Sequence, residues 1–435
     1  LIIGGVTDGN TPDDIVFVIR IISTAILVVP VLSVSRGYLQ GHKFITPTPI
    51  SQVIEQLVRV VIIVVGSYLM LKVFNLPLRS AVGCAVFAAT IGALCSYFYI
   101  YMKIKKNKEQ LILKSKVKEP QITTKEILKK LIVYAVPFVM IDLFRSIYNS
   151  VDVITLVKAL VNDFGYATKE AETVMSVIST WGLKLNMIII SIVSGMMTSL
   201  IPNLTDSFVK KDMKDVERKI NQTLEVILCV SLPMTIGLSF LTTPVWKAFY
   251  GASVYGPITY RYLVFVAFAT TLFTASTTTL QLLKEYKMVF VTLIVGLLLK
   301  STLNIPFMYL ANNLGIYPFY GAITATMLGF VTSAIIATVH IKRKFNISYK
   351  DVYSQFKHIV VGVALMLLSM FLLEVFIPLK VNSRILSILI AGLYALVGGS
   401  VYLFYMYKTK TLEKVFGKSI LEKIKNKLCR KRKEA

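Results

Sequence analysis

Residues 361–377 read VGVALMLLSMFLLEVFI, a run that places apolar side chains on every face of a helix. Such a helix lies either inside a large protein or in lipid. A hydrocarbon core about 30 Å thick needs roughly 20 apolar residues per helix, and comparable runs recur along the chain between short polar segments. Of the residues, 55% are hydrophobic and 16% charged, and the mean hydropathy is +0.69. The sequence therefore predicts an all-α integral membrane protein without a soluble catalytic domain.

Eleven helices are expected, and proline or glycine marks many of the joins between them. Their ranges are 14–36, 50–72, 80–102, 131–157, 173–201, 220–243, 258–283, 288–311, 318–341, 358–378 and 384–407. The apolar residues 1–6 resemble the end of a further helix. The implied organisation is the remainder of an N-terminal lobe over 1–104, a linker over 105–130, a C-terminal lobe over 131–345, a final helix pair over 355–407 and a basic tail over 408–435.

Basic residues are distributed unequally between alternate loops. One set of loops, which includes the tail, contains 35 of the 48 Lys and Arg residues, and the other set contains 8. Basic loops remain on the cytoplasmic side of a membrane, so the C-terminus is expected in the cytoplasm. A net charge of +25 would suggest nucleic acid in a soluble protein. Here it indicates orientation and contact with anionic lipid headgroups, and no nucleic-acid partner is expected.

Metal and cofactor chemistry have no support in the sequence. No zinc-type spacing of Cys and His occurs, and most of the four cysteines fall within apolar runs. A membrane enzyme would need a catalytic carboxylate pair or a metal motif at a loop, but the outer loops are short and contain few acids. No metal, cofactor or catalytic residue is predicted.

An internal repeat appears at an offset of 241 residues. Several polar landmarks coincide without a gap: Arg20 with Arg261, Lys43 with Lys284, Ser51 with Thr292, Arg59 with Lys300, Pro77 with Pro318 and Lys103 with Lys344. The matched helices are an even number apart, so the two halves share one orientation, as in transporters built from parallel repeats. We expect two lobes of six helices related by a pseudo-two-fold axis along the membrane normal, followed by two C-terminal helices.

The same offset bears on the start of the chain. The second half begins near residues 125–131, which puts the start of the first half roughly 110 residues before Leu1. The expectation is a fragment that lacks the first two to three of fourteen helices. Such a fragment is expected to be inactive by itself.

One motif narrows the family. It comprises RGYLQG (36–41), Pro47, ISQVIEQ (50–56) and Arg59-Val60. Weaker matches follow: Pro137 with Asp152, SLIP (199–202), Pro233 with Gly237, Lys300 with Asn304, and Gly315 with Gly321 and Thr326. From Arg36 to about Phe345 the chain resembles the polysaccharide biosynthesis and stage V sporulation protein B family, which includes the MurJ-type lipid II flippases. This family belongs to the multidrug/oligosaccharidyl-lipid/polysaccharide exporter superfamily.

The resemblance implies a transporter rather than an enzyme. Its substrate would be an undecaprenyl-pyrophosphate-linked saccharide, with lipid II as the first candidate, moved across the cytoplasmic membrane by alternating access. Family members have a polar cavity between the lobes and a groove for the lipid tail at the last two helices. The expected protein is a monomer. Flippases for capsule, O-unit or spore cortex glycans and drug/cation antiporters of the same superfamily remain as alternatives.

Ionisable side chains within the apolar runs are the candidate site, because such groups are costly in a bilayer and mark function. The predicted substrate contacts are Arg59, Arg145, Lys184 and Lys300, with Glu55 and Asn304. Against Glu55, Asp142 and Asp152 the four cations leave one excess positive charge. A pyrophosphate would neutralise this charge, since guanidinium groups bind it bidentately. The alternative is a purely structural ion-pair network.

A further expectation concerns coupling. The resemblance implies that some relatives bind sodium between an acidic residue of the second lobe's first helix and positions i, i+4 of its fifth helix. The matching positions here are Lys300 and Asn304, so a fixed cation replaces the ion. Depth in the membrane favours Asp142 as the partner of Lys300, whereas the family pattern favours Asp152. We expect transport that does not depend on a sodium gradient and is driven by membrane potential or proton motive force.

Overall fold

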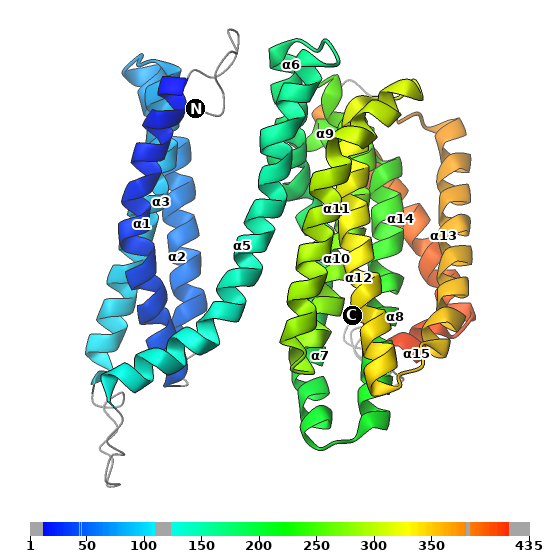
Figure 1. Ribbon diagram of the computed structural model, residues 1–435. Coiled ribbons are helices and arrows are strands. Elements are labelled where there is room, and N and C mark those ends of the chain that lie inside the picture. Colours follow the sequence, from blue (N-terminus) through cyan, green and yellow to red (C-terminus); the bar gives the residue numbers. More distant parts are fainter. Residues whose placement is uncertain (1–11, 43, 45, 109–122, 380–382, 417–435) are drawn as a thin grey trace, which may run out of the picture. The chain divides into compact units, whose positions relative to one another are not determined.

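A computed structural model describes residues 12–42, 44, 46–108, 123–379 and 383–416 (Figure 1). Throughout these ranges every regular element is helical, and ten helices are long and apolar enough to cross a membrane. Each of the eleven predicted helices is present. The prediction of an all-α integral membrane protein is confirmed. The chain divides into two compact units, Leu1–Ile127 and Leu128–Ala435, which we describe separately.

The first unit contains three long helical segments. Helix α1 covers Pro12–Gly41, α2 covers Pro47–Val61 and α3 covers Leu78–Lys106. Two π-helical turns, η1 (Ile62–Gly66) and η2 (Leu69–Val73), extend α2. Helix α3 packs against both α1 and α2. Prolines stand at the starts of α2 and α3, where the missing N–H costs nothing.

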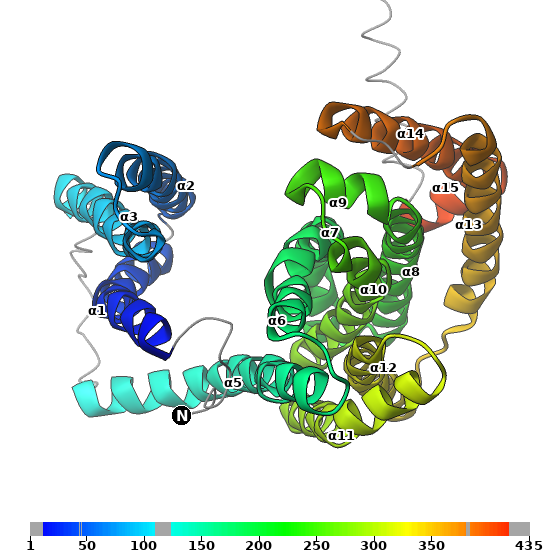
Figure 2. The same cartoon turned by 90° about the horizontal axis from the view of Figure 1, so that it is seen from above.

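The second unit contains the remaining helices. They are α5 (Thr124–Asn162), α6 (Thr168–Ser176), η3 (Val177–Trp181), α7 (Gly182–Val209), α8 (Met213–Phe240), α9 (Thr242–Tyr250), α10 (Tyr255–Leu282), α11 (Tyr286–Asn313), α12 (Pro318–Phe345), α13 (Lys350–Phe376), α14 (Arg384–Lys408) and α15 (Thr411–Phe416). Within this unit, α13 and α14 lie on the side opposite α5 and α11 (Figure 2). Helices α9 and α15 were not predicted, because nine and six residues are too few for a membrane-length apolar run.

The helix bounds agree with the 241-residue repeat. Shifted by that offset, α1 would cover 253–282, the segment from α2 through η2 would cover 288–314, and α3 would cover 319–347. The observed bounds of α10, α11 and α12 differ from these values by two residues at most. Packing within each unit agrees as well, since α12 contacts both α10 and α11, as α3 contacts α1 and α2.

Glycines allow α11 and α12 to approach closely. A methyl group built on Gly296 would lie 3.0 Å from the carbonyl oxygen of Gly329, and one on Gly329 would lie 2.8 Å from that of Gly296. Small residues at such positions bring membrane helices into backbone contact. One turn away, the Ser333 hydroxyl donates to the Thr292 carbonyl at 2.7 Å. The two helices therefore form a tight pair that carries part of the site described next.

Candidate functional site

A buried ion pair joins α5 to α11 inside the second unit. Lys300 Nζ lies 2.8 Å from Asp152 Oδ2, and the two residues are 1% and 7% exposed. Two unpaired charges at this depth would each cost several kcal/mol, and mutual contact offsets part of that cost. The structure thus pairs Lys300 with Asp152. The depth argument, which favoured Asp142, is wrong.

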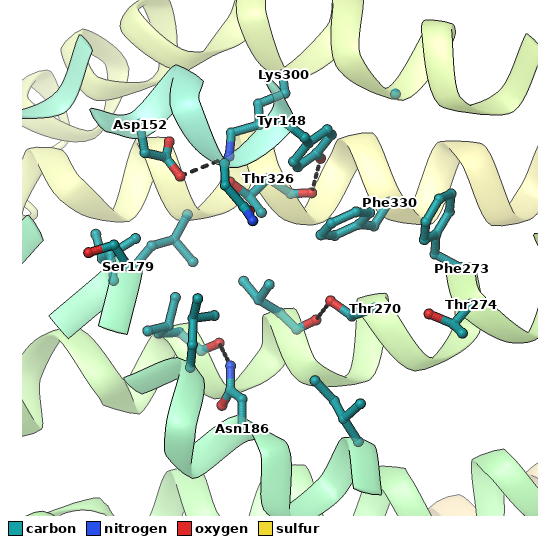
Figure 3. A pocket seen from close by; sticks show the side chains of 18 of the residues that line it. Tyr148, Asp152, Ser179, Asn186, Thr270, Phe273, Thr274, Lys300, Thr326 and Phe330 are labelled. Carbon is teal, nitrogen blue, oxygen red and sulfur yellow. Dashed lines mark hydrogen bonds and ion pairs between the residues drawn. The ribbon is translucent and has the colours of Figure 1, made fainter. Parts of the chain in front are cut away.

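An aromatic side chain completes the surroundings of the ammonium group. Lys300 Nζ lies 4.4 Å from the ring centroid of Tyr148, a distance at which the ring face attracts a cation. The Tyr148 hydroxyl donates to the Thr326 carbonyl at 2.7 Å, and its ring stacks on Phe330 with centroids 4.5 Å apart. Figure 3 shows Lys300 between Asp152 and Tyr148. These contacts hold the cation at one place on the cavity wall.

Asn304 supports the carboxylate from behind. Its Nδ2 donates to Thr155 Oγ1 at 2.7 Å and to Asp152 Oδ1 at 3.3 Å. Asn304 follows Lys300 by one helical turn, so both side chains leave α11 on the same face. It is fully buried and is not among the residues that line the neighbouring cavity. Its role in this unit is to orient Asp152.

The ion pair lies on the wall of a cavity of about 550 Å³ within the second unit. Helices α5, α6, α7, α10, α11 and α12 and the π-helical turn η3 enclose it. Polar side chains from η3, α7 and α10 face the ion pair across the cavity (Figure 3), and they are Ser179, Asn186, Thr270 and Thr274. Aromatic rings of Phe273 and Phe330 form its apolar part. The cavity is therefore amphipathic, with hydroxyl and amide groups suited to a sugar and apolar surface beside them.

The charge of this cavity is balanced. Among the described residues that line it, Asp152 is the only carboxylate and Lys300 the only cation. The excess positive charge expected from the sequence is not found among the described residues that line this cavity. Asn186 leaves its Oδ1 without a hydrogen-bond donor while its Nδ2 donates to the Leu263 carbonyl at 3.3 Å. A free acceptor on the wall is available to a hydroxyl group of a ligand.

A second charged cluster lies in the first unit. Glu55 accepts from Arg59 Nη2 at 2.8 Å and from Arg36 Nη2 at 2.9 Å. Arg36 also donates to the hydroxyls of Ser51 and Ser96, both at 2.8 Å. The i, i+4 pair of Glu55 and Arg59 was expected, but the contact from Arg36 was not. Arg59 keeps its Nε without a partner.

Of the remaining predicted residues, the structure describes the side chain of Lys184, which is not brought to either cluster. Lys184 is exposed on α7, although its neighbour Leu183 lines the cavity. Arg145 and Asp142 lie on α5 where the side chains are outside the described part of the structure. The predicted substrate contacts of Lys184 and Arg145 and the coupling role of Asp142 stay predictions.

Two contributors were missed by the sequence reasoning. Arg36 stands in the family motif beside Gly37, and its charge near the end of a predicted helix was a usable signal. Tyr148 precedes Asp152 by four residues and therefore shares its helical face. A tyrosine is common in a membrane helix and does not by itself indicate a site. Only the position of Lys300 could have revealed the role of Tyr148.

Comparison with known proteins identifies the family. A family model described as "Lipid II flippase MurJ" matches residues 172–390, and one described as "Polysaccharide biosynthesis protein" matches residues 9–208. The lipid II flippase MurJ of Bacillus subtilis (strain 168) is 33% identical over 424 residues, which are 95% of this chain and 76% of that protein. The chain belongs to the lipid II flippase MurJ family. The resemblance drawn from the sequence motif is confirmed.

Other relatives agree with this assignment. Stage V sporulation protein B of Bacillus subtilis (strain 168) is 23% identical over 229 residues, which cover 52% of the MurJ-family chain and 43% of that protein. A solved structure named "Lipid II flippase MurJ, inward closed conformation" superposes with a TM-score of 0.63. It covers 91% of this chain and 74% of its own at 17% identity, which shows a shared fold.

Proposed function

We propose that this MurJ-family protein moves polyprenyl-pyrophosphate-linked saccharides, and lipid II in particular, across the cytoplasmic membrane by alternating access. The observation that carries the proposal is the 33% identity over 95% of the chain to a lipid II flippase. The protein is thus a transporter and not an enzyme. Its orientation, with basic loops and C-terminus in the cytoplasm, follows from the charge distribution. A monomer that contacts anionic lipids through those loops is part of the proposal.

Two features of the second unit support this substrate class. The amphipathic cavity offers hydroxyl and amide groups beside an ion pair inside a membrane helix bundle. An apolar groove of about 370 Å³ lies between α8, α13 and α14, and its lining includes Pro233, Met366, Met370, Tyr394 and Tyr402. A polar head and a long apolar tail need one surface of each kind. A polyprenyl-linked saccharide has both parts.

The cavity disfavours the drug/cation antiporter alternative. Export of a cationic drug requires an acidic group that is free to bind it. Asp152 instead contacts Lys300 and Asn304, and no other carboxylate lines the cavity among the described residues. A cationic ligand would have to displace the ammonium group of Lys300 from its partner.

A second candidate is transport of another polyprenyl-linked glycan. Similarity to stage V sporulation protein B favours it, because that relative belongs to the same broader family. The two candidates differ only in the head group, and hydroxyl and amide groups on the cavity wall suit either one.

Reconstitution and complementation test the proposal. The full-length gene product in vesicles is expected to expose fluorescent lipid II on the opposite leaflet, and to rescue a strain depleted of its own lipid II flippase. Asp152→Asn should abolish both effects, whereas Thr302→Ala, an exposed position on the same helix as Lys300, should abolish neither. Flipping of a different lipid-linked glycan without flipping of lipid II would support the second candidate. Export of cationic dyes with no lipid flipping would refute both.

A further inference from the structure

A second cavity, of about 880 Å³, opens at the end of the second unit where α8 and α13 begin. It shares no lining residue with the cavity around Lys300. Its lining residues belong to helices α8, α13 and α15, which Figure 1 labels. We call it the headgroup groove, and its lining residues are Lys214, Glu217, Arg218, Asn221, Gln222, Glu225, Asp351, Ser354, Gln355 and Lys414.

Two pairs of oxygen-bearing side chains face each other across this groove. Asn221 and Glu225 are one turn apart on α8, and Asp351 and Gln355 are one turn apart on α13. The two helices pack against each other. Asn221, Gln355 and Glu225 are only 4%, 5% and 7% exposed, so they form the deep wall of the groove.

The deep wall presents hydrogen-bond acceptors without donors. Asn221 Nδ2 donates to the Ser348 carbonyl at 2.7 Å, which fixes the amide and leaves Oδ1 free. Gln355 Oε1 is also free. Glu225 forms no hydrogen bond or direct ion pair with a described residue, but the charges of Lys414 and Asp351 act on its carboxyl group. Buried acceptors are normally satisfied, so this wall suits a ligand that donates several hydrogen bonds, and the Glu225 carboxyl favours one that carries positive charge.

The rim of the groove has the opposite character. Lys214 and Lys414 form no ion pair with the described residues, and Arg218 pairs with Asp215 outside the groove lining. These cations surround the opening above the acceptor wall. A ligand that spans both regions would carry a cation at its tip and an anion next to it.

The groove lies at the level of lipid headgroups. On α13, Lys357 Nζ lies 5.0 Å from the Tyr353 ring centroid, and on α14, Lys408 Nζ lies 5.5 Å from that of Phe404. Tyr353 and Phe404 are themselves exposed. Aromatic rings with neighbouring lysines are typical of the membrane–water interface. The groove opens at the same end of these helices.

We propose that the headgroup groove binds a phospholipid whose headgroup joins a primary ammonium to a phosphate. The ammonium donates to Glu225, Asn221 and Gln355, and the phosphate contacts Lys214 and Lys414. An anionic lipid without an amine would leave the acceptors unpaired. An inorganic cation is a weaker candidate, because the described residues contain no group of three or more His, Cys, Asp or Glu side chains that could hold a metal. This site is independent of the transported substrate.

Stepwise methylation of the headgroup tests the proposal without a change in the protein. The full chain is purified, and lipid retention is measured by native mass spectrometry in equimolar mixtures of phosphatidylethanolamine, its monomethyl and dimethyl derivatives and phosphatidylcholine. Each methyl group removes one N–H donor and keeps the charge. Charge-assisted hydrogen bonds contribute about 1.5–3 kcal/mol each, so retention should fall by about tenfold or more from the first lipid to the last.

Variants locate the site. Glu225→Gln and Gln355→Leu should each abolish the preference for the primary amine. Glu374→Gln makes the same chemical change as Glu225→Gln at the far end of α13, outside the groove, and should leave the preference intact. Equal retention of all four lipids would refute the proposal. A preference for phosphatidylglycerol, when that lipid is added to the mixture, would refute it as well. If Mg²⁺ abolishes the preference and also raises the melting temperature of the protein, the groove is an inorganic cation site and the proposal is refuted.

Discussion

Lys300 and Asp152 each depend on the other for a tolerable environment. The ammonium group contacts a carboxylate and an aromatic face, and the carboxylate also accepts from the Asn304 amide. Neither residue reaches water to any useful extent. Removal of one partner leaves a buried charge, whereas removal of both leaves only polar or apolar groups. The pair can therefore be tested by comparing single and double substitutions.

Lys300→Met and Asp152→Asn should each reduce the free energy of unfolding by about 3–5 kcal/mol. The double variant should recover most of that loss, because no uncompensated charge remains. Melting temperature of the purified protein measures stability, and the vesicle assay measures transport. We expect the double variant to be stable but inactive. A double variant that transports normally would show that the pair only stabilises the fold.

Lys300 also bears on ion coupling. Its ammonium group already satisfies Asp152, so the carboxylate needs no sodium ion from solution. Transport of lipid II in vesicles is expected to proceed at the same rate with and without a sodium gradient. The comparison needs vesicles with an equal membrane potential in both conditions. A rate that rises with inward sodium would overturn this expectation.

Glu285, between α10 and α11, should give the lobe a pH-dependent contact. Hydrogen bonds from Lys344 and His340 hold the pKa of its carboxyl below the usual 4.5. A lowered pKa contributes stability above the unfolded value, and this contribution is lost as pH falls through the folded value. Glu285→Gln should lower the melting temperature at pH 7 by the equivalent of about 1 kcal/mol or less. At a pH below the folded pKa the two proteins should melt alike; a constant difference would contradict this.

At the scale of elements, the contact between α11 and α12 positions Tyr148. A methyl group on Gly329 would collide with the Tyr148 hydroxyl and lie 2.8 Å from the Gly296 carbonyl oxygen. Gly329→Ala should therefore separate the two helices and move Tyr148 away from Lys300, at a cost of about 1–3 kcal/mol. Gly195→Ala, where a methyl group meets nothing within 4 Å, is the matched control. Equal melting temperatures of the two variants would contradict this account.

In the first unit, one arginine joins three helices. Arg36 on α1 contacts Ser51 and Glu55 on α2 and Ser96 on α3. Lysine lacks the planar fork that makes these contacts together, so Arg36→Lys should destabilise the unit by about 1–3 kcal/mol. Arg59→Lys should cost less, because the hydrogen bonds of Arg59 stay within α2. Thermal melts of both variants decide this, and a larger loss for Arg59→Lys would refute it.

The elements show what apolar periodicity can and cannot predict. Every membrane-length helix was predictable, because an apolar run of about 20 residues matches the thickness of the hydrocarbon core. The π-helical turn η3, which brings Ser179 to the cavity, was not, since one extra residue per turn changes no composition. The error over Asp142 has a related cause. Asp152 lies ten residues before the end of α5 at Asn162, and Lys300 lies thirteen residues before the end of α11 at Asn313, so depth counted from the predicted helix starts was misleading.

At the scale of the whole molecule, the repeat was the most informative sequence signal. It aligned Arg59 with Lys300, and the structure places both residues on the second helix of matching triplets. Their surroundings differ, because Glu55 aligns with Gly296 and the acid of the second unit comes from α5 instead. Sequence repeats preserve backbone architecture more faithfully than charge partners. The repeat could therefore not identify the partner of Lys300, and the structure was needed to identify it as Asp152.

Because Lys300 is covalently part of the chain, Asp152 has a counter-ion that needs no binding equilibrium with solvent. A dissociable counter-ion stabilises its site according to mass action, so its occupancy follows concentration and vanishes on dialysis. An ammonium group on the chain is present once per molecule at every dilution. The second unit should accordingly keep the same melting temperature when sodium is exchanged for a bulky organic cation at constant ionic strength. A site with a dissociable ion takes its counter-charge from the medium, whereas in this chain the counter-charge is incorporated during synthesis.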